Sequence, residues 1–551
     1  MSGLTYDYII AGGGTAGCLL ANRLSKDPNI RVLMVEAGGS GRHPYIEVPL
    51  LLPKLLGNPK FDWMYKSAPE PHCGGRTIPL PRGRMLGGSS GINGMVYVRG
   101  HRWDYDNWAA QGNEGWSWDD VLPYFMRSEN FIGEDLQGRG KTGEWKITDP
   151  GMRWPVLDAY AEAATQIGIP ATRDYNSGEN EGVQYFQAQV MRGRRQSTEK
   201  AFLRPASGRE NLTVRTGAMA ERVICKGRRA TGLAFRADGE TVIATARREV
   251  ILCAGAFGTP ILLERSGIGA AERIKALGVD PVHELPGVGE NLQDHWHIRV
   301  QTRVRNTRTL NSRVSSPFGK ALMGADYVLR RRGPLSAQPA LLAVFAKVME
   351  DAPAPDVQIH ASAASYDRVG GPIHNYPGMT SAVCILRPES RGHVHATGPE
   401  PKAQPEILHN FLATDYDCEI AVRSVELVRR ITCAPAMARF EPQEIAPGAG
   451  LRTRDELLGY ARRTVTTTFH PVGTCKMGPG PEAVVDARLK VHGMAGLRVV
   501  DASIMPTIPS GNTCAPVVMI AERAVDLILG ERTEEAADNK AGNLEWISSP
   551  T

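Results

Sequence analysis

The fold of this chain is decided by the stretch Tyr6-Asp7-Tyr8-Ile9-Ile10-Ala11-Gly12-Gly13-Gly14-Thr15-Ala16-Gly17. A short apolar run leads into Gly12-x-Gly14-x-x-Gly17, and a helix-like stretch, a second apolar run and the acidic Glu36 follow. In a dinucleotide-binding βαβ unit, Gly12 permits the tight turn, Gly14 lets a pyrophosphate approach the backbone, and Gly17 lets the helix pack on the strand. Free N–H groups at the helix start attract phosphate. We therefore predict a nucleotide-binding βαβ unit in the first 40 residues.

The bulk composition is typical of a globular chain with more than one domain. At 551 residues the chain is too long for one small core. Hydrophobic residues make up 42% and charged residues 22%, both ordinary fractions. A net charge of +5, with no segment rich in both basic and aromatic residues, argues against nucleic acid as a partner. We expect the short basic clusters at 192–195 and 330–332 to be solvated faces or loops.

We expect a cytoplasmic protein, for which peripheral contact with a membrane stays open. The nine cysteines are scattered without a Cys-x-x-Cys pair, which favours reduced thiols over disulfides or a zinc site, so we expect no metal. The N-terminus lacks a basic segment followed by an apolar one, which argues against a signal peptide. No apolar run approaches the ~18 residues of a membrane-spanning helix.

Features typical of a nucleotide site recur at the N-terminus, in the middle and near the C-terminus, so this domain must be assembled from separated segments. We predict a mixed α/β fold with a discontinuous Rossmann-like domain and a second domain whose mostly antiparallel sheet is covered by helices. The nucleotide-binding domain is assigned residues 1–150, 211–300 and 466–531. The substrate-binding domain is assigned residues 151–210 and 301–465, and residues 532–551 are expected to form a flexible tail.

Shorter patterns predict individual elements. Residues 103–130 and the region around 151–175 have helical periodicity, and residues 211–252 alternate apolar and polar residues like a β-meander. The stretch 45–82, rich in proline and aromatics, is expected to form an ordered but irregular cover. An amphipathic helix is predicted from about Val517 to Leu529, with Pro516 in its first turn.

Four blocks of sequence together resemble the glucose–methanol–choline (GMC) flavoprotein oxidoreductase family, especially its choline-dehydrogenase-like and bacterial alcohol-dehydrogenase branch. The first block is the glycine fingerprint, and the blocks span nearly the whole chain. The other three are Gly83-Arg84-Met85-Leu86-Gly87-Gly88-Ser89-Ser90-Gly91-Ile92-Asn93, Gly255-Ala256-Phe257-Gly258-Thr259-Pro260 continuing to Gly269, and Phe469-His470-Pro471-Val472-Gly473-Thr474 continuing to Gly478, with Asn512 placed 42 residues after His470.

The resemblance implies FAD, held at the seam between the two domains. At the ADP end it implies contacts by Gly12, Gly14, Thr15, Ala16, Gly17, Glu36 and Ala37, with Glu36 accepting from a ribose hydroxyl and Val223 on the adenine side. Around the ribityl chain and flavin it implies contacts by Gly87, Ser89, Asn93, Gly94, Met95, Val96, Asp501, Ala502 and Thr513. Some relatives attach FAD covalently through a histidine just before the asparagine of the first signature. Because Ile92 stands there, we predict non-covalent FAD.

His470 and Asn512 match the catalytic pair of the family. Oxidation of an alcohol by a flavin requires loss of the hydroxyl proton and transfer of a hydride to flavin N5. A histidine suits the base, whereas Asn512 can only hold the alcohol oxygen by hydrogen bonding. The resemblance implies an alcohol dehydrogenase or oxidase that forms the aldehyde, in some members the acid, with oxygen or a quinone-type electron acceptor. His295 and His297 are expected to serve structure or flank the cofactor.

Other functions on the same scaffold stay open. The family includes hydroxynitrile lyases, in which FAD is structural, a light-driven fatty-acid decarboxylase, and choline dehydrogenase proper; a flavin-binding protein without catalysis is a further alternative. We see no acidic residue to pair with the ammonium of choline, whereas Phe61, Trp63, Tyr65 and Leu50-Leu51-Leu52 indicate an apolar or aromatic entrance. An apolar or aromatic primary alcohol is therefore favoured, and both a monomer and a homodimer are compatible with the sequence.

Overall fold

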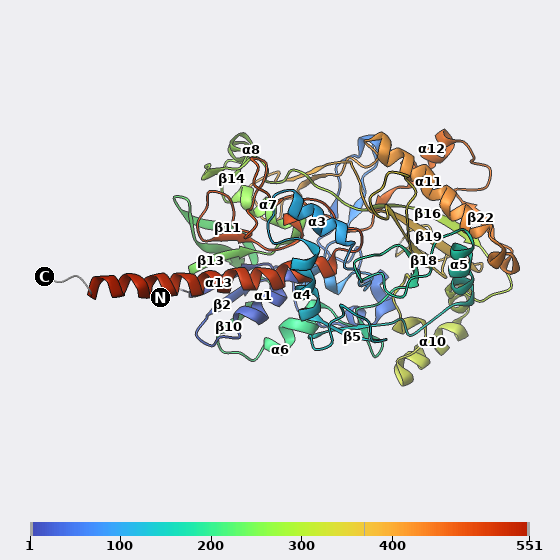
Figure 1. Ribbon diagram of the computed structural model, residues 1–551, viewed down its shortest axis with the longest axis horizontal. Coiled ribbons are helices and arrows are strands. Elements are labelled where there is room, and N and C mark those ends of the chain that lie inside the picture. The colour runs from blue at the N-terminus through green and yellow to red at the C-terminus, as the bar shows by residue number, and fades with distance from the viewer. Residues whose placement is uncertain (1–3, 369, 548–551) are drawn as a thin grey trace.

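Two seven-stranded sheets organise the chain (Figure 1). The computed structural model describes residues 4–368 and 370–547, with side chains described as far as Glu531. In Figure 1 the first sheet lies on the left, with α1 and α13, and the second lies on the right beneath α11 and α12. This pairing of a mostly parallel sheet with an antiparallel one confirms the predicted fold class.

The first sheet contains the glycine fingerprint and has the strand order β10-β2-β1-β13-β12-β11, with β24 beside β13. Its strands are β1 (Leu4–Ala11), β2 (Val32–Val35), β10 (Leu212–Arg215), β11 (Met219–Lys226), β12 (Arg229–Ala237), β13 (Glu240–Leu252) and β24 (Leu497–Val499). The predicted meander is right for β11 to β13 but wrong for β10, which pairs with β2 in parallel. Local alternation predicts a strand without identifying its partner.

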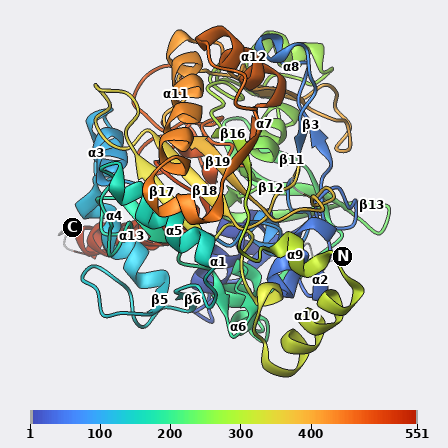
Figure 2. The same ribbon diagram turned by 90° about the vertical axis from the view of Figure 1, so that its right-hand side faces the viewer.

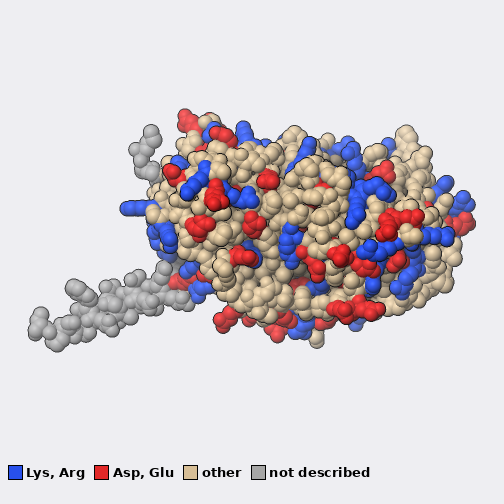
Figure 3. Space-filling view, turned by 90° about the horizontal axis from the view of Figure 1, so that it is seen from above, with Lys and Arg blue, Asp and Glu red and all other residues tan. Residues whose placement is uncertain are grey.

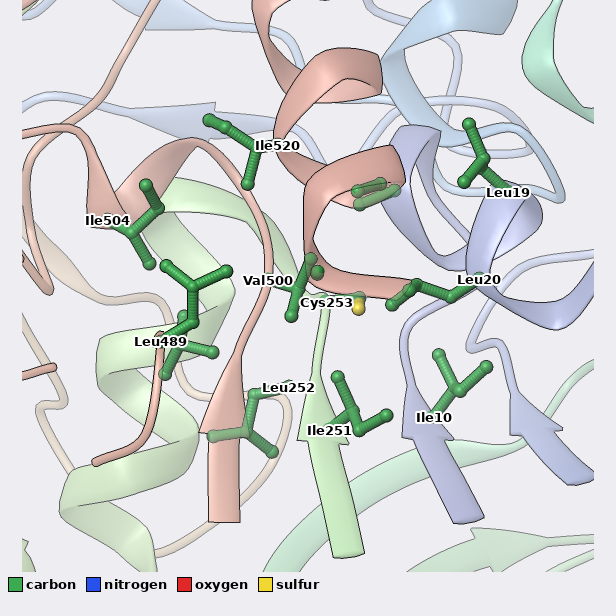
Figure 4. Close-up of a cluster of buried hydrophobic side chains, with 14 of the residues drawn as sticks. Ile10, Leu19, Leu20, Ile251, Leu252, Cys253, Leu489, Val500, Ile504 and Ile520 are labelled. Atoms are coloured by element: carbon green, nitrogen blue, oxygen red, sulfur yellow. The ribbon is translucent and has the colours of Figure 1, made fainter. Parts of the chain in front are cut away.

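Helix α1 (Thr15–Leu24) packs closely on the first sheet because Gly17, in its first turn, has no Cβ to separate the helix from the end of β1. A Cβ added at Gly17 would lie 2.0 Å from the carbonyl oxygen of Gly12. The core beside this turn joins side chains from both ends and the middle of the chain, and Figure 4 shows among them Ile10, Leu20, Ile251, Val500 and Ile520. The nucleotide-binding part is therefore discontinuous, as predicted.

The second sheet is antiparallel throughout, in the order β22-β16-β19-β18-β17-β7, with β23 beside β16. Its strands are β7 (Gly182–Tyr185), β16 (Trp296–Arg303), β17 (Leu342–Ala346), β18 (Val357–Ser362), β19 (Gly378–Ile385), β22 (Gln443–Ala446) and β23 (Thr466–Thr467). Helices α5 (Pro155–Gln166), α11 (Asp415–Thr432) and α12 (Arg454–Thr464) pack against it (Figure 2). Strand β16 begins at Trp296, so the second segment of the substrate-binding domain starts slightly before residue 301, where we placed its boundary.

Shorter elements connect the two parts. The remaining helices to residue 330 are α2 (Pro44–Glu47), α3 (Arg102–Ala110), α4 (Trp118–Ser128), α6 (Arg204–Ala206), α7 (Gly255–Arg265), α8 (Ala271–Ala276), α9 (Leu310–Val314) and α10 (Pro317–Arg330). Two-stranded ladders join β3 (Tyr65–Lys66) to β4 (Pro79–Leu80), β5 (Glu129–Ile132) to β6 (Trp145–Thr148), β8 (Val190–Met191) to β9 (Arg194–Arg195), β14 (Ile268–Gly269) to β15 (His283–Glu284) and β20 (His393–His395) to β21 (Glu406–Leu408). Helices α3, α4 and α5 confirm the predicted helical periodicities.

Short 3-10 or π turns complete the connections: η1 (Pro49–Lys54), η2 (Pro71–Cys73), η3 (Gly88–Gly91), η4 (Glu199–Leu203), η5 (Pro334–Ser336), η6 (Pro435–Phe440) and η7 (Ala502–Ile504). The stretch 45–82 contains only α2, η1, η2 and the two-residue strands β3 and β4. It is ordered and irregular, as predicted.

The C-terminal helix α13 (Cys514–Ile547) is longer than predicted. We expected a helix ending near Leu529 and a loose tail from residue 532, of which residues 548–551 lie outside the described part. Glu531 pairs with Arg488 at 2.7 Å, with Lys490 at 3.0 Å and with Arg498 at 2.5 Å. The following sequence is rich in Glu and Ala, which favour helix, so the helix continues beyond this anchor.

We expect Gly17→Ala to destabilise the protein by about 1–3 kcal/mol, because the new methyl group would collide with the Gly12 carbonyl. Thermal unfolding followed by circular dichroism measures the effect. Gly39→Ala is the matched control, since nothing lies within 4 Å of a Cβ added there. An unchanged midpoint for Gly17→Ala would show that the turn moves aside freely.

Candidate active site

A cavity of about 390 Å³ is lined by residues of both sheets. The first sheet contributes the turn after β1, Glu36 after β2 and Asp501 after β24. The second contributes side chains of β16, β18 and β19. The carboxyl ends of parallel strands therefore open into the cavity, which is the usual position of a ligand in an open α/β sheet.

Most of the predicted site residues line this cavity, namely Gly12, Gly14, Thr15, Ala16, Glu36, Ala37, Ser89, Asn93, Gly94, Met95, Val96, His470, Asp501, Ala502, Asn512 and Thr513. Three do not. Gly17 faces the Gly12 carbonyl, and Gly87 donates its backbone N–H to the carbonyl oxygen of Gly13 at 2.8 Å. Val223 is buried further along β11, and residues 218–220 line the cavity instead.

Glu36 lies where the glycine fingerprint meets the cavity. Its Oε2 accepts from the backbone N–H of Gly13 at 2.9 Å and its Oε1 from that of Gly38 at 2.7 Å. Burial raises the pKa of Glu36 to about 7, and the two N–H donors act against this rise. Each carboxylate oxygen keeps a further lone pair, so the side chain is fixed in place and still able to accept from a ribose hydroxyl.

Arg195 supports the loop that carries Asn93. Its Nη1 donates to the backbone oxygen of Asn93 at 2.7 Å and to Oδ1 of the same residue at 2.6 Å. Its Nε donates to the carbonyl oxygen of Ile46 at 2.9 Å. Burial lowers the pKa of Arg195 to about 9, and no carboxylate in the described part of the chain pairs with it. The buried cation therefore bonds to neutral oxygens and fixes the loop against the cavity.

His470 and Asn512 form the middle of a hydrogen-bonded chain of side chains. Nε2 of His470 lies 3.1 Å from Nδ2 of Asn512, whose Oδ1 accepts from Nε2 of Gln358 at 3.3 Å. On its other side, Nδ1 of His470 lies 3.0 Å from Nδ1 of His295. Nε2 of His295 lies 3.2 Å from the carbonyl oxygen of Leu386. The structure thus brings together the two predicted catalytic residues and adds His295 and Gln358.

These partners give the hydrogen bonds one direction. A carbonyl oxygen can only accept, so Nε2 of His295 carries the hydrogen and Nδ1 of the neutral ring accepts. His470 then donates from Nδ1, and the lone pair on its Nε2 accepts from Nδ2 of Asn512 at the cavity. Burial, and next the neighbouring His295, lower the pKa of His470 well below its usual 6.5, and burial lowers the pKa of His295 to about 4. Both rings are therefore neutral at pH 7, and His470 has the form that a general base requires.

The backbone of His470 is anchored by a buried ionic group. Its N–H donates to Oδ1 of Asp294 at 2.8 Å. His409 lies between Asp294 and Glu70, with ion pairs of 3.4 and 3.3 Å. Burial opposes a charge on His409, but the two neighbouring carboxylates, Asp294 and Glu70, outweigh it and raise the pKa of His409 to about 9. A charged histidine thus balances the carboxylate that positions the catalytic segment.

The second sheet supplies lining residues that the sequence analysis did not select. Between β16 and β19, His297 lies opposite Cys384 and Arg299 lies opposite Ala382. Between β19 and β18, Ala382 lies opposite His360. All five line the cavity. Nε2 of His297 and Nε2 of His360 have no hydrogen-bond partner among the described residues. The signal in the sequence was the spacing of His295, His297 and Arg299, which places alternate residues of a strand on one face.

One group of metal-ligating side chains occurs in the described part of the chain: His295, Cys384 and His470, whose ligand atoms lie within 4.8 Å of one another. The two histidines already hydrogen-bond to each other through Nδ1. Burial raises the pKa of the Cys384 thiol to about 12, so the sulfur keeps its proton, whereas zinc binds the thiolate. These atoms therefore fit the hydrogen-bonded chain better than a metal centre.

Comparison with known proteins identifies the family. A family model for GMC oxidoreductase matches residues 6–297, and a second, also for GMC oxidoreductase, matches residues 388–521. The chain belongs to the GMC oxidoreductase family. This oxidoreductase is 39% identical over 531 residues to the oxygen-dependent choline dehydrogenase of Photobacterium profundum, and the match covers 96% of this chain and 93% of the relative.

Solved structures share the architecture of this GMC oxidoreductase. The pyridoxine 4-oxidase from Mesorbium loti superposes with a TM-score of 0.85 at 33% identity, over 94% of this chain and 98% of that one. The formate oxidase from Aspergillus oryzae RIB40, in a variant studied for FAD modification, gives a TM-score of 0.91 at 27% identity, over 97% and 100% of the two chains. The resemblance inferred from the four sequence blocks is confirmed.

We expect His295→Leu to slow substrate oxidation by about tenfold to a hundredfold, because the Nδ1–H of His470 would be buried without an acceptor. The pH profile should also change. In the wild type the rate should stay flat from pH 8 down to about 6, since the pKa of His470 is depressed. Loss of the neighbouring ring should move the acidic inflection upward. His295→Gln, whose amide oxygen can accept, should restore most of the rate; a normal rate and profile for His295→Leu would contradict the assigned role.

Proposed function

We propose that this GMC oxidoreductase binds FAD and oxidises a primary alcohol to the aldehyde. The observation that carries the proposal is the hydrogen-bonded series from Gln358 through Asn512 and His470 to His295, in which Nε2 of His470 is an unprotonated acceptor at the cavity. When bound, FAD supplies the acceptor for the hydride that leaves the carbinol carbon.

The residues around the cavity fit FAD. Gly14 is the N-cap residue of α1 and is open on the cavity side, since a Cβ added there would meet only the carbonyl oxygen of Cys253, at 3.7 Å. A phosphate can therefore approach the free N–H groups of the helix. Glu36 is fixed in place for the ribose, and the loop residues 93–96, held by Arg195, line the cavity between Glu36 and His470. A single cavity with these groups along its wall suits an elongated dinucleotide.

The chain's own residues divide the remaining tasks. Nε2 of His470 takes the proton of the substrate hydroxyl, and the Nδ1–H···Nδ1 bond to His295 keeps the ring in the required tautomer. Nδ2 of Asn512 donates to the substrate oxygen as its negative charge develops. Gln358 holds Oδ1 of Asn512 and thereby turns the amide nitrogen toward His470.

The cavity favours a neutral, apolar or aromatic alcohol over choline. Its carboxylates are Glu36 and Asp501, and both accept from backbone N–H groups on the side of the first sheet. The second sheet contributes Arg299 and two histidines, so no carboxylate there can pair with a quaternary ammonium. Trp63 and Tyr65 stack with ring centroids 5.7 Å apart and line the cavity.

Part of the predicted apolar entrance lies elsewhere. Leu52 lines the cavity with Trp63 and Tyr65, whereas Phe61 does not line it and is buried behind this wall in a cluster with Leu52 and Ile46. The acceptor that we propose is oxygen, which the name of the Photobacterium relative supports, with a quinone-type compound as the alternative.

A hydroxynitrile lyase-like reaction is the second candidate, because a lyase also uses a histidine base. Anaerobic mixing of the holoenzyme with a panel of alcohols separates the two. Bleaching of the flavin supports oxidation, and an unchanged spectrum during turnover supports lyase chemistry. The panel includes benzylic and aliphatic alcohols together with choline. Reduction by choline alone would contradict the substrate class that we propose.

We expect His470→Ala to lower the rate of flavin reduction by about a hundredfold or more while FAD stays bound, because the general base is lost. Stopped-flow absorbance under anaerobic conditions measures the rate, and the visible spectrum measures bound FAD. His72→Ala, at an exposed histidine, is the control. Near-normal reduction by His470→Ala would remove this residue from the mechanism.

We expect FAD to be released when the holoenzyme is precipitated with acid, because Ile92 offers no atom for a covalent bond at the position where some relatives have histidine. The absorbance of the supernatant and the colour of the pellet decide the outcome. Yellow colour that stays with the pellet would show covalent attachment at another residue.

A further inference from the structure

Helix α10 (Pro317–Arg330) turns apolar side chains toward solvent, the reverse of an ordinary surface helix. The exposed fractions are 78% for Phe318, 60% for Leu322, 68% for Val328 and 81% for Leu329. With the exposed Ala321 and Ala325, these residues form the outward face of α10. The opposite side is anchored: Met323 and Tyr327 are buried, and Oη of Tyr327 donates to the carbonyl oxygen of Gly193 at 3.0 Å.

Basic residues flank α10 in the sequence. Residues 305–332 contain one acidic residue, Asp326, and seven Lys or Arg residues, at positions 305, 308, 313, 320, 330, 331 and 332. Seven positive charges minus one negative charge give this segment a net charge of +6, whereas the net charge of the whole chain is +5. By contrast, basic and acidic side chains are mixed over the face seen in Figure 3. Arg330 and Arg332 are exposed, as expected for this cluster, and Arg331 lies over the ring of Tyr327.

The inner side of α10 is linked to one wall of the cavity. Helix α10 contacts η5, and η5 in turn contacts η1. Leu52 of η1 lines the cavity, as do Leu56 just after η1 and Pro339 and Ala340 just after η5. Figures 1 and 2 both show α10 at the edge of the molecule. The helix is therefore free on its outer side and linked on its inner side to the cavity wall.

We propose that α10 docks this protein on an anionic phospholipid surface. Its outward face enters the upper acyl region, and the flanking Lys and Arg meet the phosphate groups. A helix of 14 residues is about 21 Å long and can lie in the plane of the interface. No helix in the described residues is long and apolar enough to cross a membrane. Docking in this way brings the wall formed by η1 and residues 339–340 toward the lipid, where an apolar alcohol concentrates.

Other occupants of this face are disfavoured. A two-fold dimer through α10 would bring two copies of the +6 segment together, and like charges oppose such pairing. The excess of positive charge instead complements a negative lipid surface.

Co-sedimentation of the full-length holoenzyme with vesicles tests the proposal without relying on turnover. The vesicles contain phosphatidylcholine alone or with about 30% phosphatidylglycerol. We expect binding to the anionic vesicles and at least a tenfold weaker affinity when salt rises from about 0.1 to about 0.5 M. The variant Phe318→Ser/Leu322→Ser/Leu329→Ser should lower affinity at least tenfold, and Arg330→Gln/Arg332→Gln should lower it mainly for anionic vesicles. Ile243→Ser, at an exposed apolar residue of β13, is the matched control and should bind normally.

Circular dichroism and thermal unfolding show whether each variant is folded. Two results would overturn the proposal: absence of wild-type binding to anionic vesicles, or binding by the folded triple serine variant that equals the wild type. Light scattering decides between lipid and a second copy. A wild-type dimer that becomes a monomer in the triple serine variant would assign the face to a partner copy and overturn lipid docking.

Discussion

Parallel pairing on both sides of β13 is the constraint on which the rest of the structure depends. The last residues of this strand pair with β1 on one side and with β24 on the other, over Ile9↔Val250 to Ala11↔Leu252 and over Val250↔Leu497 to Leu252↔Val499. Three strands from the beginning, middle and end of the chain therefore finish at the same edge. The glycine turn, the start of α7 and Asp501 follow these strand ends directly. One sheet edge thus assembles a site from segments that are hundreds of residues apart.

The second sheet completes that edge with chemistry of a different kind. Backbone N–H groups and two anchored carboxylates dominate on the side of the first sheet, whereas the second sheet contributes two imidazoles and the guanidinium of Arg299. Asn512 and His470 meet between them, the first oriented by Gln358 of β18 and the second by His295, which directly precedes β16. Every side chain in this hydrogen-bonded series is neutral. The direction of its hydrogen bonds therefore depends only on which atoms can donate and which can accept. The carbonyl oxygen of Leu386 sets that direction, since it can only accept.

The sequence was sufficient for the parts of the fold and site that local patterns encode. The glycine spacing around Gly12 predicted the βαβ unit, and the resemblance identified His470 and Asn512, which the structure places 3.1 Å apart. Pairing across long distances was not encoded locally: β10 had the pattern of a meander strand but joined β2. His295 was set aside because nothing in its surroundings shows that a ring at residue 470 will face it. Val223 was misplaced for a similar reason, since the point where β11 leaves the cavity wall depends on the register of the sheet.

The late position of β24 has a consequence for biosynthesis. During translation, the edge of β13 that β24 will cover is exposed until residues 497–499 have left the ribosome, and the segments carrying His470, Asp501 and Asn512 emerge at nearly the same time. An incomplete chain therefore has the glycine turn but lacks the wall opposite it. A site lined by residues of both regions is therefore complete only after residues 497–513 have joined the sheet. Until then the uncovered edge of β13 can pair with strands of other chains, and binding of a chaperone to the nascent protein would prevent such pairing.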